Sequence, residues 1–406
     1  MARLTQVTAG FLPLLDSLLL VVARERGFAE AEGLDLQLVR ETSWANIRDR
    51  IAVGHFDVAH MLAPMPIAAA LGLNPLPCPV IAPMALGLGG NAVTVGASLW
   101  QAMAEAGAPG DLSAAAAGAA LRAVVRAREA AKANKLRFGV VHPHSGHNYE
   151  LRYWLMSSGV HPDRDVDIVI LPPPILPDAL SRGTIDGYCV GEPWNSVAVV
   201  QGAGRIATVK AAIWRSSPEK VLGVRGAWAE SEGESLAALL RALYRAAHWC
   251  ADPVHHEAAA EILAAPTYLD LDPALLLAGL SGRLSIAPGE ARMVEDFFIP
   301  EARAATFPWQ SHALWFYSQM VRWGHVAHTA NNAALAAASY RPDLYRAAIA
   351  PLGAPVPGAN AKVEGALARP TPVGVTKGSL ALGPDGFFDG EIFDPDHLDA
   401  YISRQK

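Results

Sequence analysis

The clearest sign of the fold class is the stretch FGVVHPHSGHNYELRYWL, which runs from Phe138 to Leu155. An apolar, strand-like segment over residues 136–141 ends at Val141, and a helical pattern opens near Ser145 to His147. A strand that passes through a short polar loop into a helix is the repeating unit of α/β proteins. We therefore predict an α/β fold.

The same alternation extends over the first two thirds of the chain. Two groups of strands, near residues 1–95 and 135–210, are followed by a return near Lys220, which is the plan of a two-lobed clamp with parallel α/β layers. From Ser235 onward the pattern is mostly helical, and residues 351–372 are a linker candidate. The expected strands are 4–9, 34–39, 57–61, 92–95, 136–141, 165–171, 185–190, 205–209 and 220–224, and the expected helices before residue 235 are 14–26, 44–53, 112–134, 148–156 and 176–182.

Composition excludes several classes of protein. The 406 residues are 51% apolar and carry a net charge of −6 without a basic block, so we expect no direct nucleic-acid binding. No apolar run reaches the length of a membrane span, and no secretory signal precedes the first expected strand. Three widely spaced cysteines are typical of reduced thiols. If the start shown is the native one, we expect a cytoplasmic protein without a membrane association.

Two strand-to-helix junctions are candidate ligand sites. In VRETSWANIRDR, Ser43 is a plausible helix N-cap and Trp44 stands at the start of the helix. In the stretch quoted first, His147 stands at the equivalent position. Helix N-termini present unpaired N–H groups and partial positive charge, so both junctions are suited to a small anion.

Two chemical alternatives remain open on the residues alone. The histidines His142, His144 and His147 are compatible with zinc or nickel, although no acidic or cysteine ligand stands close by in the sequence and loop histidines without a role are common. Glu192 with His147 resembles an acid/base pair, but no nucleophile elbow or phosphate loop accompanies it. We expect no metal, no cofactor and no catalysis.

Several segments of the sequence resemble a known protein family. The segments HNYELRYWL, SPEKVLGVRGAW and FDPDHLDAY, together with the N-terminal 56 residues from Phe11 to Pro66, are similar to the nitrate/bicarbonate-binding NrtA/CmpA family. The resemblance covers nearly the whole chain. It implies a type II periplasmic-binding-protein fold, with lobe I over residues 1–93 and 219–406 and lobe II over residues 94–218.

The resemblance also implies a set of anion ligands. The family's aromatic–helix junction, glutamine, histidine and lysine fall on Trp44, Asn91, His147 and Lys220, and the backbone N–H of Ala45 accompanies Trp44. Asn91 departs from the family's glutamine and shortens the reach of the amide by one methylene. Lysine would supply charge, and the histidine, amide and indole would donate hydrogen bonds.

The segment DGYCVGEPWN, residues 186–195, ends an expected strand at the cleft. We expect Glu192 to orient Lys220 or help set the closure of the lobes, because a carboxylate facing nitrate would repel it. Trp194 is expected to pack behind the lobe, and Ser43 to support the first junction.

Three functions follow from these expectations. The leading hypothesis is a cytoplasmic nitrate or nitrite sensor of the NasS type, which releases a NasT-type RNA-binding antiterminator of the ANTAR class when the anion closes the lobes. The alternative is the solute-binding receptor of an ABC transporter for nitrate, bicarbonate or cyanate. A third is an enzyme on the same fold, similar to those that make thiamine pyrimidine precursors.

Overall fold

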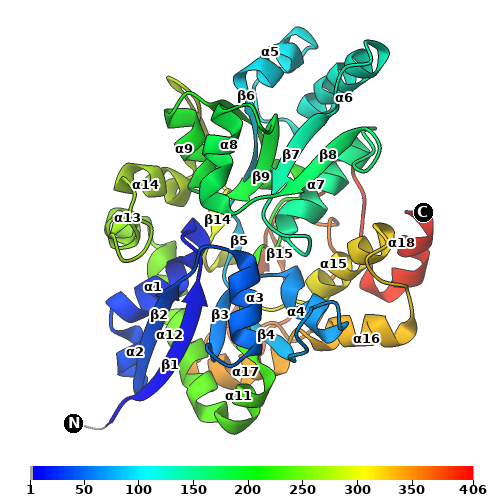
Figure 1. Ribbon diagram of the computed structural model, residues 1–406. Helices are drawn as coiled ribbons and strands as arrows, with labels where there is room; N and C mark the ends of the chain where they lie inside the picture. Colours follow the sequence, from blue (N-terminus) through cyan, green and yellow to red (C-terminus); the bar gives the residue numbers. More distant parts are fainter. Residues whose placement is uncertain (1–2, 406) are drawn as a thin grey trace.

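A computed structural model describes residues 3–405. Its strands form two five-stranded sheets, one in each half of the molecule (Figure 1), and three two-stranded sheets, β12-β13, β14-β5 and β15-β16. The first sheet, which we call the sheet of lobe I, has the order β2-β1-β3-β11-β4. Strands β1, β2 and β3 are parallel, whereas β11 is antiparallel to both of its neighbours. Their bounds are β1 Thr5–Phe11, β2 Leu34–Arg40, β3 Val58–Leu62, β4 Val80–Ala85 and β11 Lys220–Arg225.

The second sheet, which we call the sheet of lobe II, has the order β10-β6-β9-β7-β8. Strand β7 is parallel to β8 and β9, whereas β6 is antiparallel to β9 and β10. The bounds are β6 Asn91–Gly96, β7 Leu136–Val140, β8 Val166–Ile170, β9 Gly187–Gly191 and β10 Gly204–Val209. The two-lobed α/β fold is confirmed.

The predicted parallel layers are interrupted by two antiparallel strands, β6 and β11, and the register gives the reason. Both strands follow a passage of the chain from the other lobe. Lys220, the first residue of β11, pairs with Leu62 at the end of β3, and Asn91, the first residue of β6, pairs with Gly191 at the end of β9. Each strand therefore enters its sheet at the edge where the neighbouring strand ends, and it runs in the opposite direction.

The pairing of β6 also shows where the chain passes from one sheet to the other. The predicted boundary between residues 93 and 94 falls inside β6, all of which pairs within the sheet of lobe II. The first passage between the sheets therefore lies before Asn91. The second lies between β10 and β11, which is the region where residues 218 and 219 were expected to separate the lobes.

Helices cover the sheets and extend the molecule at its C-terminal end (Figure 1). In lobe I, α1 packs against α12 and α13, and in lobe II, α5 packs against α6 and α8 against α9. Their bounds are α1 Leu18–Glu25, α2 Phe28–Ala31, α3 Trp44–Ala52, α4 Pro64–Ala70, α5 Ala97–Glu105, α6 Ala114–Ala130, α7 Gly146–Ser157, α8 Leu176–Ser181, α9 Trp194–Val200, α10 Lys210–Ile213, α11 Gly226–Ser231, α12 Gly233–Ala251, α13 His256–Ala264, α14 Pro273–Ser281, α15 Gln310–Arg322, α16 Ala330–Ala338, α17 Pro342–Ile349 and α18 Leu398–Arg404.

Residues 351–372 do not form a free linker. Val356 and Glu364 within this segment are fully buried. Glu364 accepts a hydrogen bond from Ser311 at 2.6 Å and pairs with Lys362, and its backbone bridges to Phe393. The proline- and glycine-rich segment follows an irregular path, and the contact between Glu364 and Ser311 holds it against α15.

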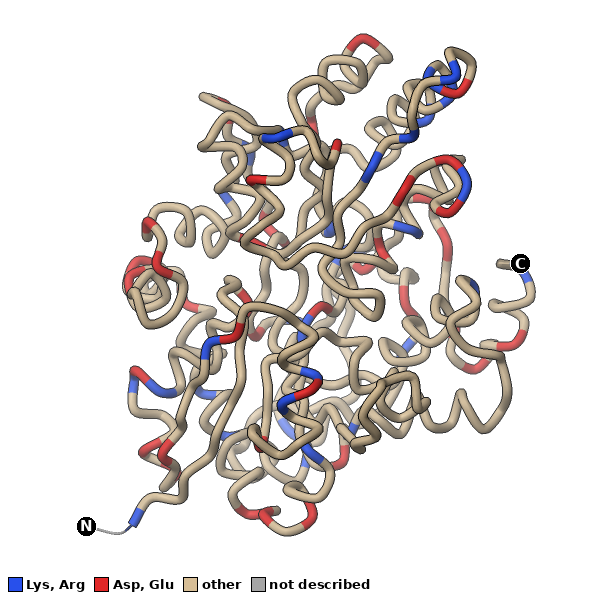
Figure 2. Tube along the Cα trace, viewed as in Figure 1, with Lys and Arg blue, Asp and Glu red and all other residues tan. Residues whose placement is uncertain are grey.

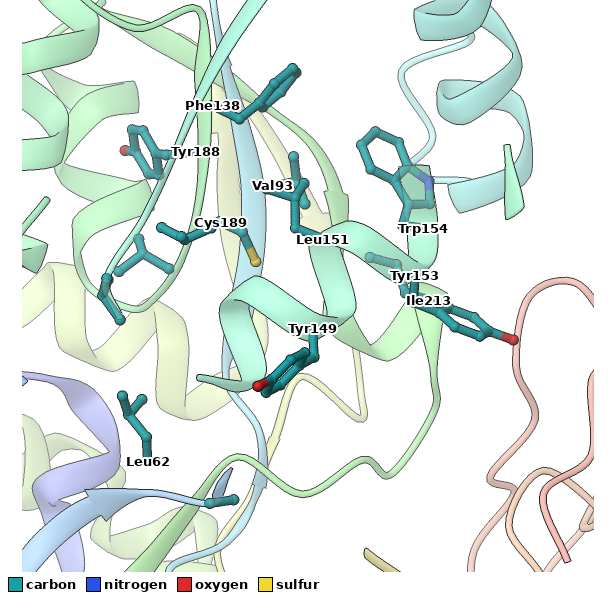
Figure 3. Close-up of a cluster of buried hydrophobic side chains, with 14 of the residues drawn as sticks. Leu62, Val93, Phe138, Tyr149, Leu151, Tyr153, Trp154, Tyr188, Cys189 and Ile213 are labelled. Atoms are coloured by element: carbon teal, nitrogen blue, oxygen red, sulfur yellow. The ribbon is translucent and has the colours of Figure 1, made fainter. Parts of the chain in front are cut away.

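The core of lobe II explains why the quoted stretch folds as it does (Figure 3). Phe138 on β7 and Tyr188 on β9 are fully buried, and Trp154 on α7 donates a hydrogen bond to the carbonyl of Ala114 at 2.8 Å. Cys189 is buried in the same core, and burial raises the pKa of its thiol well above the ordinary value. None of the described helices is long and apolar enough to cross a membrane.

Candidate functional site

Four of the predicted ligands lie together where the two sheets face each other. Asn91 begins β6, Lys220 begins β11, His147 is the second residue of α7 and Trp44 is the first residue of α3. Their exposed fractions are all 1% or less. Figure 2 shows charged segments in the middle of the molecule as well as on its periphery. The site is therefore a buried polar cluster between the lobes.

The polar groups of this cluster converge on one carboxylate, that of Glu219. Its Oε1 atom lies 2.8 Å from Lys220 Nζ and 3.1 Å from His147 Nε2. Its Oε2 atom accepts hydrogen bonds from Asn91 Nδ2 at 2.7 Å and from Lys210 Nζ at 2.6 Å. Each carboxylate oxygen thus has two nitrogen atoms beside it. Neither Glu219 nor Lys210 was predicted from the sequence.

A second layer of charged residues surrounds the two lysines. Asp16 Oδ2 accepts from Lys220 Nζ at 2.7 Å, and Asp16 Oδ1 lies 2.8 Å from His60 Nε2. On the other side, Glu150 Oε1 lies 2.6 Å from Lys210 Nζ. All of these side chains are buried. Each lysine is therefore held between two carboxyl groups.

The sequence contains partial signals for three carboxyl groups that were not predicted, those of Glu219, Glu150 and Asp16. Glu219 directly precedes Lys220, and Glu150 follows His147 by three positions, which places both on one face of α7. Asp16 interrupts an apolar run in LPLLDSLLL. A carboxylate inside such a run, in the turn just before the first helix, is the signal that could have identified it.

Burial and charge pull the pKa values of the acids in opposite directions. For Glu219, burial opposes ionisation, but Lys210 and Lys220 hold its pKa well below the ordinary value. For Asp16, burial is likewise overcome by Lys220 and His60, and the pKa is lowered to about 2. Both carboxylates are therefore ionised at neutral pH.

Other members of the cluster are kept neutral. Burial raises the pKa of Glu150 to about 8, although Lys210 opposes this shift. Burial lowers the pKa of His147 to about 3 and also lowers that of His60. At pH 7 the negative charges of Asp16 and Glu219 therefore balance the positive charges of the two lysines.

Trp44 occupies the predicted helix junction. The hydroxyl of Ser43 accepts from the backbone N–H of Asn46 at 3.2 Å, so Ser43 is the N-cap of α3, as expected, and Ala45 is the second residue of this helix. The Trp44 ring lies 5.5 Å from Lys220 Nζ and 5.3 Å from the His60 ring.

Several polar atoms of the cluster are buried without a hydrogen-bond partner among the described residues. They include Trp44 Nε1, Asn91 Oδ1 and both ring nitrogens of His147, and the others are Asp16 Oδ1, His60 Nε2 and the two carboxyl oxygens of Glu150. An unpaired buried donor is costly in a folded protein and calls for an explanation. The indole N–H of Trp44 and the ring N–H of His147 can donate to an anion.

The expected role of Glu192 toward Lys220 is wrong. Glu192 is buried, and its Oε2 accepts from the backbone N–H of Ser196 at 3.1 Å, whereas Lys220 is oriented by Asp16 and Glu219. The backbone carbonyl of Glu192 accepts from the N–H of Leu15 at 2.8 Å. Glu192 is therefore tied to the start of its own helix, and its backbone joins the two lobes.

Trp194 also joins the lobes. Its Nε1 donates to the carbonyl of Pro13, in the loop after β1, at 3.1 Å. The indole is buried in a hydrophobic core, and its N–H also reaches across to lobe I. Burial raises the pKa of the neighbouring Glu192 to about 7, against the effect of its hydrogen bonds with Ser196.

The three histidines of the metal alternative diverge. His147 enters the buried cluster, whereas His144 Nδ1 lies 3.0 Å from the hydroxyl of Tyr149, which in turn lies 2.9 Å from His325 Nδ1. His142 Nδ1 accepts from the backbone N–H of His144 at 3.1 Å. Within residues 3–405 no group of three or more metal-binding side chains has a suitable arrangement.

Residues 2–264 match the sequence profile described as the NMT1-like family. The chain is 34% identical over 399 residues to the nitrate import ATP-binding protein NrtC of Synechocystis sp., a match that covers 97% of this chain and 54% of NrtC. It is 30% identical over 413 residues to the nitrate/nitrite binding protein NrtA of Synechococcus elongatus, covering 98% of this chain and 86% of NrtA. It therefore spans about half the length of the first relative and most of the second.

A solved structure of a nitrate-binding protein is also similar to this chain. The periplasmic nitrate-binding protein NrtA from Synechocystis PCC 6803 superposes with a TM-score of 0.85 at 25% identity, and the match covers 100% of this chain and 99% of that protein. These relatives are named for binding and transport. They favour the receptor alternative over the cytoplasmic sensor, which was the leading hypothesis from the sequence.

Proposed function

This chain belongs to the NMT1-like family, among the NrtA/CmpA nitrate/bicarbonate-binding proteins, and from that membership we propose that it binds one small planar oxyanion between its lobes. Nitrate or nitrite is the proposed ligand. The proposed role is that of the solute-binding receptor, or receptor domain, of an ABC importer.

The observation that carries this proposal is the convergence of four nitrogen atoms on one planar carboxylate. Two lysines, an amide and an imidazole approach the two oxygens of Glu219 from α7, β6, α10 and β11. This is the donor set that an oxyanion requires, and charge-assisted hydrogen bonds of this kind are about twice as strong as neutral ones. In a buried site they are strengthened further because the local dielectric is low.

The arrangement favours binding over reaction. Charge stabilisation and hydrogen bonding are its only evident capacities, since the buried carboxylates are paired with lysines and His147 is held neutral. Retention of one anion and its release to a transporter require no bond to be made or broken.

The proposal is tested by the thermal stability of the purified chain in a panel of sodium salts. A ligand that binds only the folded chain stabilises it by about 2.7 kcal/mol at a concentration one hundred times its Kd. We expect nitrate and nitrite to raise the midpoint of thermal unfolding, and chloride at equal ionic strength to leave it unchanged. Equal midpoints in nitrate, nitrite, bicarbonate, cyanate and chloride would contradict the proposal.

The sensor hypothesis and the cytoplasmic location stay predictions. Control of a NasT-type antiterminator requires that nitrate weaken partner binding, and by linkage the partner must weaken nitrate binding by the same factor. Copurification of an RNA-binding antiterminator in the absence of nitrate, and its release on addition of nitrate, would favour the sensor over the receptor.

A further inference from the structure

We propose that the carboxylate of Glu219 is an internal occupant of the anion position, which an external anion must displace in order to bind. This inference rests on the proposed function, because it names the group with which the ligand competes. It makes Glu219 a residue that sets both the affinity and the shape selectivity of the site.

Glu219 lies against the same donors that are predicted to bind nitrate. Asn91, His147 and Lys220 are the predicted anion ligands, and each of them lies within 3.1 Å of a Glu219 oxygen. A carboxylate and a nitrate are both planar monoanions with acceptor oxygens on a trigonal centre. An external anion cannot occupy the same position while the Glu219 carboxylate is in place.

The backbone around Glu219 leaves room for its carboxylate. Gly146 is the first residue of α7, a helix of 12 residues, and a Cβ atom built at this position would overlap with Glu219 Oε2. Gly146 is not among the glycines of positive φ, so the close approach, and not the backbone conformation, explains the glycine here. The positive end of the α7 dipole also faces this carboxylate.

The charges around Glu219 point the same way. With Glu219 in place, the two lysines of the cluster already face three carboxyl groups, those of Asp16, Glu150 and Glu219. A second anion at the same donors would leave an unbalanced negative charge in a site sealed from water. Like charges about 4 Å apart repel strongly in such surroundings. Displacement of the Glu219 carboxylate relieves this repulsion.

Displacement requires movement of the side chain only. The backbone carbonyl of Glu219 accepts from the N–H of Ala63 at 3.0 Å, and Lys210 Nζ donates to the carbonyl of Pro218 at 2.6 Å. These bonds fix the chain on both sides of the Cα atom. The carboxylate therefore leaves through rotation about the side-chain bonds, while the lysines keep their positions for the incoming anion.

The shape of this occupant defines the ligand class. A site that fits a flat carboxylate with two donors at each oxygen accepts planar monoanions such as nitrate, nitrite, bicarbonate and formate. Tetrahedral dianions such as sulfate place oxygens out of this plane and bring a second negative charge. We therefore expect sulfate to be rejected.

The test is isothermal titration of the full chain with nitrate, for the wild type and for Glu219→Gln. The glutamine keeps the size of the side chain, but its amide NH2 cannot accept from the donors around it. We expect nitrate to bind at least about tenfold more tightly to the variant, because its competitor has lost its charge. Unchanged or weaker nitrate binding by a folded Glu219→Gln chain would overturn the proposal.

Glu364→Gln is the matched control. Glu364 is as deeply buried as Glu219 and is likewise paired with a lysine and a histidine, Lys362 and His312, but it lies in the C-terminal segment away from the site. Its substitution is expected to leave nitrate affinity unchanged. A similar gain in affinity in this control would show that loss of any buried carboxylate has the effect, and it would overturn the proposal.

A second variant covers the case in which Glu219→Gln does not fold. Glu219→Ala opens a space of carboxylate size beside Gly146, and we expect formate and nitrate, but not sulfate, to raise its thermal midpoint more than that of the wild type. Equal shifts in the two proteins would overturn the proposal. If the wild type binds nitrate and these variants show no gain, only this inference fails, whereas an absence of binding by every protein contradicts the proposed function itself.

Discussion

Replacement of Lys220 by methionine removes the central charge of the site with little change in side-chain length. Lys220 is fully buried and its Nζ lies 2.7 Å from Asp16 Oδ2 and 2.8 Å from Glu219 Oε1. In Lys220→Met the two carboxylates face each other without this cation. The variant should therefore affect both the stability of the fold and the binding of an anion.

The size of each effect follows from the contacts. Removal of one partner from a buried ion pair costs about 3–5 kcal/mol of stability, because the remaining charge is buried without compensation. A hydrogen bond to a charged group contributes about 1.5–3 kcal/mol, so loss of Lys220 should weaken nitrate binding roughly tenfold to a hundredfold. Urea denaturation measures the first quantity, and isothermal titration at a temperature where the variant is folded measures the second.

A matched variant separates these effects. Lys362 also joins two buried carboxylates, Glu364 and Asp385, in the C-terminal segment. Lys362→Met should lose a similar amount of stability and keep the nitrate affinity of the wild type. The reasoning is refuted if a folded Lys220→Met chain binds nitrate as the wild type does, or if both variants lose affinity equally.

Three further predictions concern individual groups of the site. Trp44→Phe keeps a ring near Lys220 but removes the unpartnered indole N–H. Titration with nitrate should show an affinity about fivefold to tenfold lower than that of the wild type. The urea concentration at the unfolding midpoint should not fall. The pKa of Glu150 is about 8 against 4.5 ordinarily, so the folded chain holds a proton that the unfolded chain has lost, and stability falls as pH rises through this window by up to about 1.4 kcal/mol per pH unit. Glu150→Gln should flatten that slope in urea midpoints measured from pH 5 to pH 8, and a slope as steep as in the wild type would contradict the assignment. Trp194→Phe loses the hydrogen bond to Pro13 between the lobes and should lower the free energy of unfolding by about 1 kcal/mol in the same assay. An unchanged free energy of unfolding would show that this bond does not hold the lobes together in solution.

The strands of the two sheets could be predicted because most are short apolar runs followed by polar turns. Strand β4 was missed, since VIAPMA over Val80–Ala85 contains a proline and follows a proline-rich loop, both of which argue against a strand. The directions of β6 and β11 were also missed. They depend on where the chain crosses between the lobes, which is a property of tertiary structure.

The candidate site was predicted in part. Trp44, Asn91, His147 and Lys220 could be placed by the family resemblance, and the structure brings them together. Glu219 could not be recognised, because a glutamate beside a lysine in a turn usually belongs to a solvated surface. Its burial results from packing of the α7 N-terminus over the start of β11, which a local pattern does not encode.

The central claim is that this chain holds one planar oxyanion at the Lys220 and His147 donors between its lobes. Isothermal titration of the wild-type chain with sodium nitrate, in a buffer that contains excess sulfate, tests it most directly. We predict saturable binding of one nitrate per chain that sulfate does not suppress. The absence of saturable heat with nitrate and nitrite, or binding abolished by sulfate, would contradict the account.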